Sequence, residues 1–419
     1  MKKTAGILLD HRSLIAFYFF GILYVLVPWK LYGGPVNQVL QASCIVWTGI
    51  ILVHDLIAER IKLDPLMIAL SVFYVWAVIS FIFQPKGHGI YPFIHLLEMV
   101  MFIGVFIPAS RTLSAEQVHR FTEIIAWMVI AIITIMNIIA IAFFYLHEQL
   151  PFPELIVRLY TSFGLRNGHP RYPGGYKHPV LAGEKCIAAI LCCLLLQSRK
   201  RIHPAAAAVI CISSLWMILL ADSRTADIQL ILIALFICAL HCIGNRKRMR
   251  IFAGMLFLLA VGFCVLVYIK LSRNTGLLFD QLNKISSNRL IIWKTSLEEF
   301  LKRPVLGWGW ENGDAIAQYT QAEIYDSHNI AVNLLLWTGL PGFGAFEAAV
   351  IAWIRRLLKN KGILQDKVYR WYILITAMFF VQSLLDILII GEDIRLGTPM
   401  FWLFAGIVYY FRKTNTESQ

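Results

Sequence analysis

Apolar residues along this chain come in runs of about 20, the length at which an α-helix spans the hydrocarbon core of a bilayer. Short segments that hold most of the charged side chains separate these runs. Twelve runs are found, beginning near Leu14, Val39, Pro65, Tyr91, Thr122, Val180, Ala205, Thr225, Ile251, Ile330, Tyr369 and Thr398. Helices satisfy every backbone group internally in lipid. The pattern therefore predicts an all-α polytopic membrane protein of about twelve transmembrane helices, forming a single integral membrane domain over residues 1–419.

Composition supports this prediction, because 58% of the 419 residues are hydrophobic and only 15% are charged. The first run is too long, and its outer flank too polar, for a cleaved signal peptide, so we expect it to be retained. The eight cysteines lie in or beside predicted spans, without the spacing of a disulfide framework or a metal site.

Lysine and arginine recur in every second connection, which predicts that these connections and both termini are cytoplasmic. The clearest examples are Arg199-Lys200-Arg201, Arg246-Lys247-Arg248 and Arg355-Arg356. We therefore expect a multi-pass protein of a bacterial inner (cytoplasmic) membrane. Basic residues that meet anionic lipid explain much of the net charge of +13, so no nucleic-acid partner is required.

The same topology places two long loops, 147–178 and 270–328, on the periplasmic face, where long loops are usually functional. The first loop combines glycine and proline with basic and aromatic side chains. That composition suits a pyrophosphate or sugar surface and equally suits an ordinary interfacial loop. Its candidate substrate contacts are Arg171, Lys177 and His178.

The second loop contains an expected amphipathic helix at 286–302, with an apolar stripe of Leu290, Trp293, Leu297, Phe300 and Leu301. We expect it to lie along the membrane surface, with Lys294, Glu298, Glu299 and Lys302 on a solvated face. Arg289 differs from these, because a cation in the first turn opposes the helix dipole. An anionic partner explains that arginine better than helix stability does.

Arg224 falls where two spans meet at the outer boundary of the hydrocarbon, so it must be paired or bind a ligand. Asp227 is one available partner, and a phosphate is the other; the sequence leaves both open. His328 and Asn329 begin the run at Ile330, where the histidine either caps a helix or takes part in chemistry. Asp386 lies just before the last outer connection, and Arg395 lies within it. An acidic residue inside the end of a membrane span usually has an ion-pair partner or a function.

Several arginines and a histidine on one face suit the handling of a lipid-linked phosphate. The arginines neutralise a departing pyrophosphate, and the histidine takes a proton from an attacking hydroxyl. A position near the positive end of a helix dipole favours the neutral imidazole that such a base requires.

Four segments carry a resemblance to a known family. They are Arg289-x-x-x-Trp293, Phe300-x-x-x-Pro304-x-x-Gly307-x-Gly309, Ser327-His328-Asn329 and Gly339-x-x-Gly342. Together they resemble the C-terminal signature of the O-antigen ligase and polymerase superfamily, and Ser223-Arg224-Thr225 matches as well. The architecture agrees over the whole chain, but the specific motifs lie mainly within residues 222–345.

The resemblance implies a GT-C-like membrane glycosyltransferase that works without a metal or nucleotide cofactor. A ligase of this family transfers O-antigen from undecaprenyl pyrophosphate to a sugar hydroxyl of lipid A–core and inverts the anomeric centre. It implies His328 as the base and Arg224 and Arg289 as pyrophosphate binders. Asp386 corresponds to an important aspartate of the family, and Arg395 follows by position alone. The implied partners are the lipid-linked glycan, lipid A–core and membrane lipid.

Three alternatives remain beside the ligase. An O-antigen or exopolysaccharide polymerase uses the same donor, and the chain length and the clear His-Asn pair favour the ligase over it. A protein-directed oligosaccharyltransferase usually has a longer C-terminal extension. A transporter usually has repeated halves and polar residues near the membrane midplane, whereas here the ionisable residues gather at the outer boundary.

Overall fold

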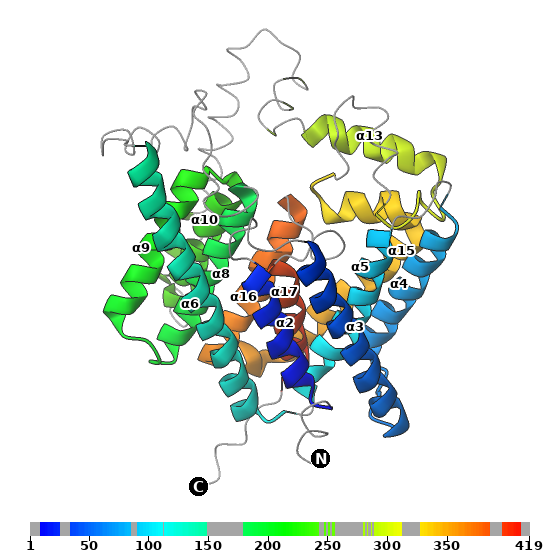
Figure 1. Cartoon of the computed structure of the whole chain (residues 1–419), viewed down its shortest axis with the longest axis horizontal. Helices are drawn as coiled ribbons and strands as arrows, with labels where there is room; N and C mark the ends of the chain where they lie inside the picture. The colour runs from blue at the N-terminus through cyan, green and yellow to red at the C-terminus, as the bar shows by residue number, and fades with distance from the viewer. Residues whose placement is uncertain are drawn as a thin grey trace.

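The computed structural model describes residues 9–25, 34–84, 90–111, 113–148, 179–242, 289–311, 327–385 and 396–411, with a few single positions between 247 and 286. Every regular element in these ranges is a helix, and the predicted all-α polytopic membrane fold is confirmed. Figure 1 shows most of the helices running side by side, with α13 lying across one end of the bundle.

The first half of the chain contains α2 (His11–Val25), α3 (Gly34–Ile57), α4 (Pro65–Ile82), α5 (Ile90–Met101), the π-helical turn η2 (Phe102–Phe106), the 3-10 turn η3 (Pro108–Arg111) and α6 (Ala115–Glu148). The second half contains α8 (Pro179–Ser198), α9 (Pro204–Ala221), α10 (Arg224–Cys242), α13 (Arg289–Lys302), α15 (Ile330–Lys359), the 3-10 turn η4 (Lys361–Leu364), α16 (Lys367–Leu385) and α17 (Gly397–Tyr409).

Eight of the described segments are long and apolar enough to cross a membrane. They are Val39–Ile57, Pro65–Ile82, Pro92–Arg111, Ala115–Ala142, Pro179–Ser198, Pro204–Ala221, Ile330–Lys359 and Lys367–Leu385. Eleven of the twelve predicted runs coincide with a described helix, α17 being a shorter apolar one. The run from Ile251 lies almost entirely outside the described residues. Helix α6 includes residues 147 and 148, which were predicted to belong to the first long loop.

Local sequence explains where several helices begin. The Asp64 carboxylate accepts hydrogen bonds from Leu66 N and Met67 N (3.1 Å each), and Pro65 occupies the first position of α4. His203 caps α9 in the same way, since its Nδ1 accepts from Ala205 N (3.3 Å). The membrane-spanning window of α8 is 83% buried, which makes this helix part of the centre of the bundle.

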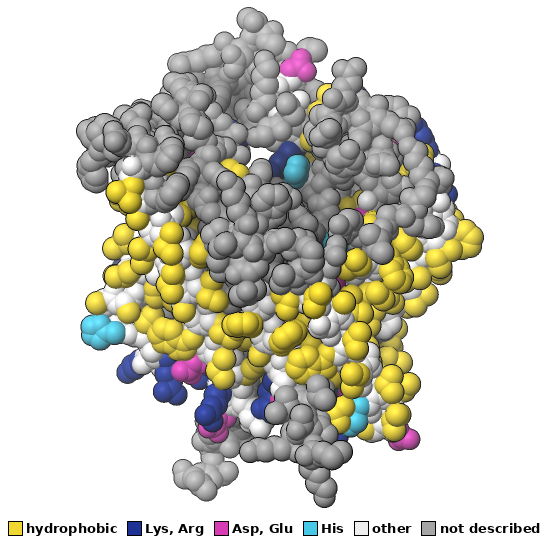
Figure 2. Space-filling model, viewed as in Figure 1, with side chains coloured by type: hydrophobic (Ala, Val, Ile, Leu, Met, Phe, Trp, Pro, Cys, Tyr) yellow, Lys and Arg dark blue, Asp and Glu magenta, His cyan; other side chains and the backbone are white. Residues whose placement is uncertain are grey.

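Connections that were predicted to be cytoplasmic, because they carry lysine and arginine, lie at one end of the bundle. Arg111 forms an ion pair with Asp64 (3.0 Å) and donates to Lys62 O (2.9 Å). Tyr410, which follows α17, donates to the same aspartate (2.6 Å). Figure 2 shows Lys and Arg side chains gathered at this end, below a belt of hydrophobic side chains. We call it the basic end, and we call the opposite end, which carries α13 and the start of α15, the α13 end.

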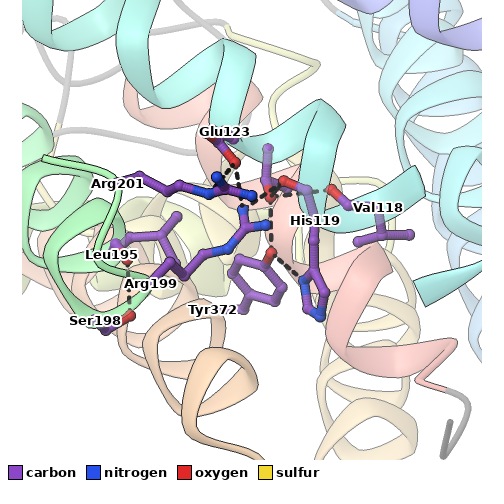
Figure 3. A network of polar contacts seen from close by, with 9 residues as sticks. Val118, His119, Glu123, Leu195, Ser198, Arg199, Arg201 and Tyr372 are labelled. Atoms are coloured by element: carbon purple, nitrogen blue, oxygen red, sulfur yellow. Dashed lines mark hydrogen bonds and ion pairs between the residues drawn. The ribbon is translucent and has the colours of Figure 1, made fainter. Parts of the chain in front are cut away.

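A second polar network ties α6, α8 and α16 together at the basic end (Figure 3). Glu123 accepts ion pairs from Arg199 (3.3 Å) and Arg201 (3.4 Å). Arg199 also donates to His119 O (2.7 Å), and the His119 ring shares a hydrogen bond with the Tyr372 hydroxyl (2.9 Å). The arginines of this network are therefore held by acceptors within the protein.

Candidate functional site

Helix α15 is interrupted at Gly339, whose φ of 66° and ψ of −170° are not helical. The chain that follows α13 folds back onto this break and satisfies its backbone groups. Trp308 N donates to Leu336 O (2.8 Å), Gly309 N donates to Trp337 O (3.0 Å), and Leu340 N donates to Pro304 O (2.8 Å). We call this contact between residues 304–309 and 336–340 the joint.

Side chains of α4 complete the joint. Trp76 Nε1 donates to Thr338 O (2.8 Å), and the Ser80 hydroxyl lies 2.7 Å from Leu306 O and 2.5 Å from Trp337 O. A break at membrane depth is tolerated only when the released carbonyls find donors in this way. The joint therefore fixes the start of α15 to α13 on one side and to α4 on the other.

The glycines of the family-like signature are explained by this joint. Gly307 has φ of 67°, and a Cβ there would lie 2.5 Å from the carbonyl carbon of Trp337. A Cβ on Gly339 would meet Val305 O even more closely. Both positions need a left-handed backbone and an absent side chain. These two glycines are therefore required by the packing of the joint itself.

The face that α13 buries differs from the predicted stripe. Phe300 is buried as expected, but Leu297 and Leu301 are 40% and 69% exposed. The buried face includes Ile292, Ser296 and Glu299. Glu299, predicted to lie on the solvated face, is only 3% exposed and binds Lys302 (2.5 Å), whereas Lys294 and Glu298 form an exposed pair (3.8 Å). The solvated position predicted for Glu299 was wrong because α13 packs on α15, which apolar spacing alone does not reveal.

Asn329, not His328, caps α15. Its Oδ1 accepts from Ala331 N (2.9 Å) and Val332 N (3.1 Å), while its Nδ2 donates to Leu384 O at the end of α16 (2.9 Å). The alternative in which His328 serves as the helix cap is therefore wrong. With most of its amide used inside the protein, Asn329 orients this turn, and its role as a substrate contact stays a prediction.

His328 adopts a left-handed backbone conformation, with φ of 54°. Its neighbours hold this turn on both sides. Ser327 N donates to Asn333 Oδ1 (3.0 Å), Ser327 Oγ donates to Asn329 O (3.0 Å), and Trp293 Nε1 donates to Ser327 O (2.8 Å). A strained residue that its surroundings hold so firmly is typical of functional sites.

Arg289 is the first residue of α13, and its Nη1 donates to Leu385 O. Arg289 and Asn329 thus bind the adjacent carbonyls of Leu385 and Leu384 in α16. The structure therefore gives Arg289 a partner that the sequence did not reveal, and it joins the arginine to the turn that carries His328.

Arg224 begins α10 and is exposed, directly after the buried Ser223. Gln229 of the same helix donates to Met378 O (3.0 Å) and to Gln382 Oε1 (3.2 Å) of α16. Arg224 lies about 7.5 Å beyond Gln229 along α10, and Leu385 lies about 4.5 Å beyond Gln382 along α16. Both helices have these ends away from the basic end (Figure 1). Arg224 is therefore at the same end of the molecule as Arg289 and His328.

Asp227 lies in the first turn of the same helix as Arg224. The pair with Asp227 and the binding of a phosphate both stay predictions for this arginine. In the view of Figure 2, Lys or Arg surface and His surface are both visible at the α13 end of the molecule. The arginines and the histidine at this end offer guanidinium donors and an imidazole to an anionic substrate.

Sequence reasoning missed two charged residues near this end. Glu184 is 1% exposed and Lys185 is 5% exposed in α8. The Glu184 carboxylate accepts from Gly397 N at the start of α17, while its neighbour Gly183 packs so tightly that a Cβ would lie 2.7 Å from Ser223 Oγ. The sequence did contain a signal for these two residues, namely an acidic and a basic side chain next to each other inside an otherwise apolar run.

Five candidate substrate contacts lie outside the described residues: Arg171, Lys177, His178, Asp386 and Arg395. They stay predictions from the sequence.

The fold and this polar junction define a class, an all-α polytopic membrane protein with a broken helix and a basic, histidine-bearing turn at one end. Residues 206–346 match the family model described as O-antigen ligase, which confirms the resemblance seen in the sequence and supports membership of the O-antigen ligase and polymerase superfamily. The match includes Arg224, Arg289, His328 and the joint. It supports a ligase or polymerase type of function in a bacterial membrane. No curated protein matches the chain.

Proposed function

We propose that this protein transfers O-antigen glycan from undecaprenyl pyrophosphate to a sugar hydroxyl of lipid A–core, at the periplasmic face of the inner membrane. One observation carries the proposal, namely that Arg289 and Asn329 bind adjacent carbonyls at the end of α16. A guanidinium and the turn of His328 thereby share one rigid junction. The family match over residues 206–346 supports the same reaction type.

In this proposal Arg224 and Arg289 bind the pyrophosphate of the donor. Arginine presents a planar set of donors that matches phosphate oxygens. Charge on these oxygens increases as the bond to the sugar breaks, so fixed guanidinium groups stabilise the transition state more than the ground state. The hydrogen bond from Arg289 to Leu385 O holds its side chain in place before the donor arrives.

His328 is the proposed general base. Its imidazole takes the proton of the acceptor hydroxyl while that oxygen forms a bond to the anomeric carbon. The bond from this carbon to the pyrophosphate oxygen breaks in the same step, and the electron pair leaves with the pyrophosphate. A single displacement inverts the anomeric centre and needs neither a covalent intermediate nor a metal.

Deletion of the gene tests the proposal in the cell. A strain without a ligase makes rough lipopolysaccharide and accumulates lipid-linked polymer, seen on a lipopolysaccharide gel and in a lipid extract. A strain without a polymerase instead carries a single O-unit on its core. The second pattern assigns the protein to the sibling activity, and unchanged lipopolysaccharide contradicts both assignments.

Reconstitution tests the chemistry directly. The purified full chain in nanodiscs receives undecaprenyl-pyrophosphate-linked glycan and lipid A–core, and the product is measured as a band of higher mass. We expect transfer to continue undiminished in EDTA, because no step requires a metal. Loss of transfer in EDTA that returns with a divalent cation contradicts the proposed mechanism.

A further inference from the structure

Arg303 directly follows α13 and is held in place by an aromatic ring. Its guanidinium carbon, Cζ, lies 5.6 Å from the centre of the Trp308 ring. Trp308 Nε1 donates to Glu299 O (2.9 Å), and this hydrogen bond fixes the ring. An arginine that stacks on an aromatic face still presents the N–H groups at the edge of its plane. Arg303 is therefore positioned before any ligand binds to those N–H groups.

The carboxylates of α13 are bound by lysines and not by this arginine. Glu299 pairs with Lys302 (2.5 Å), and Glu298 pairs with Lys294 (3.8 Å). Within the part of the chain that the structure describes, no carboxylate forms an ion pair with Arg303. In this respect Arg303 differs from the arginines of the basic end, which bind acidic side chains of the protein.

Exposed apolar side chains lie next to Arg303. Leu301 and Val305, two residues before and after it, are 69% and 56% exposed. Leu340 of the joint and Ile82 near the end of α4 are exposed to a similar extent. Exposed apolar side chains of a membrane-spanning bundle face lipid, and an arginine among them directs its charge to the head groups at the membrane surface. The setting of Arg303 therefore favours an anionic group that belongs to a lipid.

Helix α13 separates this arginine from the candidate site. It begins at Arg289, which donates to Leu385 O of α16, and Arg303 follows its last residue. At a rise of 1.5 Å per residue, the two arginines lie about 20 Å apart along the helix. Figure 1 shows α13 lying across the end of the bundle, with α4 at its edge and α16 nearer its middle. Arg303 is therefore at the edge that faces lipid, one helix length from the turn of His328.

We propose that Arg303 binds a phosphate at the lipid end of the acceptor, so that α13 sets the distance from that phosphate to the acceptor hydroxyl at His328. The inference rests on the proposed function, in which the acceptor is lipid A–core, and it adds how the acceptor is selected. Lipid A carries phosphate groups at the membrane surface, and the core sugars extend from there. A planar guanidinium matches the oxygens of such a phosphate. A core that is too short does not reach both ends of α13.

Removal of the phosphates tests the contact. The full-length protein in nanodiscs receives the donor together with lipid A–core, or with the same glycolipid after its phosphates have been removed. We expect Arg303→Ala to raise the acceptor KM about tenfold, with kcat and the donor KM unchanged. Removal of the phosphates should raise the acceptor KM of the wild type to a similar extent and have little further effect on Arg303→Ala. Two independent, fully additive losses overturn the inference.

A second charge on the same helix provides the matched control. Lys294→Ala removes one positive charge from α13, but Lys294 pairs with Glu298, so we expect the acceptor KM of the wild type. An equal rise of KM in Lys294→Ala and Arg303→Ala indicates a general effect of charge and overturns the inference. So does competition by phosphatidylglycerol in the nanodisc that raises the acceptor KM of the wild type to that of Arg303→Ala, because the site then belongs to ordinary phospholipid.

Acceptors with shortened cores test the distance. The wild type should prefer the full core over a core that lacks its outer sugars, measured as the ratio of the two kcat/KM values. We expect Arg303→Ala to reduce this ratio about tenfold, because the phosphate is no longer held at a fixed distance from His328. A purely structural role of Arg303 would lower both values equally. An unchanged ratio therefore overturns the inference.

A binding measurement separates this inference from the proposed function. If glycan is transferred and Arg303→Ala behaves as the wild type, the phosphate site is wrong and the function stands. If no glycan is transferred, but fluorescent lipid A–core binds the wild type about tenfold more tightly than Arg303→Ala, the function is wrong and the phosphate site stands. A size-exclusion profile and thermal unfolding of each variant show that it is folded.

Discussion

The two ends of the bundle are joined by different chemistry. At the basic end, Arg111 binds the carboxylate of Asp64 and Arg199 binds that of Glu123. At the α13 end, the contacts that unite α13, α15 and α16 are made to backbone carbonyls instead. Arg289 donates to Leu385 O, and Trp293 donates to Ser327 O. A carboxylate offsets the charge of the arginine that it binds, whereas a backbone carbonyl positions an arginine and carries no net charge itself.

The left-handed backbone of His328 has a different setting from that of three other left-handed residues. Glu59 and Lys200 at the basic end lie two residues beyond α3 and α8, and Asp222 directly follows α9. After α8, for example, Arg201 N donates back to Leu196 O (2.9 Å), which is the ordinary use of this conformation at a helix end. His328 is left-handed before a helix, where this reason does not apply. The comparison separates arginines that hold the fold at the basic end from a strained turn that lies next to Arg289 at the α13 end.

The largest expected effect comes from the histidines. His328→Ala should lower kcat on the order of 10²–10⁴-fold, the contribution of a positioned general base. His203→Ala is the matched control, because that histidine caps α9 at the basic end and its removal should leave transfer unchanged. Both variants are assayed with the same reconstituted donor and acceptor. Full activity of His328→Ala removes that residue from the proposed mechanism.

Substitution of arginines at the two ends should also have different effects, on transfer at the α13 end and on stability at the basic end. Arg289→Ala should reduce transfer on the order of 10²-fold, as loss of one transition-state donor does, with Arg289→Lys in between. Arg199→Ala should lower the free energy of unfolding by about 1–3 kcal/mol, because Arg199 binds both Glu123 and His119 O. Its kcat should stay at the wild-type value. A pure loss of stability in Arg289→Ala would make that arginine structural as well.

The joint should respond to a single methyl group. Gly339→Ala forces a left-handed alanine against Val305 O, so we expect a loss of about 1–3 kcal/mol in unfolding free energy and a matching loss of transfer. Gly344→Ala, five residues further along α15, meets nothing within 4 Å and should be neutral or slightly stabilising. Thermal unfolding of the two variants measures the difference. Equal melting temperatures would contradict the role given to the joint.

The length of the apolar runs and the basic connections between them were enough to predict the bundle. A helix that crosses lipid must be long and apolar, and the loops on its cytoplasmic side are enriched in lysine and arginine. The apolar spacing predicted a helix at 286–302, and α13 extends over Arg289–Lys302. The break in α15 had local signals in Gly339 and Pro341. The donors that allow it come from residues 304–309 and from Trp76 and Ser80 of α4, and no local pattern indicates such distant partners.

The candidate site was predicted only as a set of residue types. Arg289 was singled out because a cation in a first turn is unfavourable for its own helix, and its role as a pyrophosphate binder stays a prediction. Its contact with Leu385 of α16 depends on how two distant helices pack and has no sequence signal. Glu299 was placed wrongly on the solvated face of α13 for a related reason. Which side of α13 packs against the bundle has no local signal, and Glu299 is buried while Leu301 is exposed.

The smallest expected effect comes from a variant that places a carboxylate beside an arginine at the α13 end, as at the basic end. It is therefore the sharpest test of the comparison. Asn329→Asp keeps the oxygen that caps α15 but replaces the donor to Leu384 O with a carboxylate beside Arg289. Asn329→Ala removes cap and donor together, which should cost about 1 kcal/mol for the cap alone. We therefore expect Asn329→Asp to melt above Asn329→Ala.

Donor binding should follow the opposite order if the positive charge of Arg289 attracts the pyrophosphate. The new carboxylate neutralises that arginine as Glu123 neutralises Arg199. The donor KM of Asn329→Asp should then exceed that of Asn329→Ala by about threefold, a difference of roughly 0.6 kcal/mol. The effect should shrink at high salt, which screens charges at an exposed site. An equal rise of KM in both variants would instead indicate that the amide itself contacts the substrate.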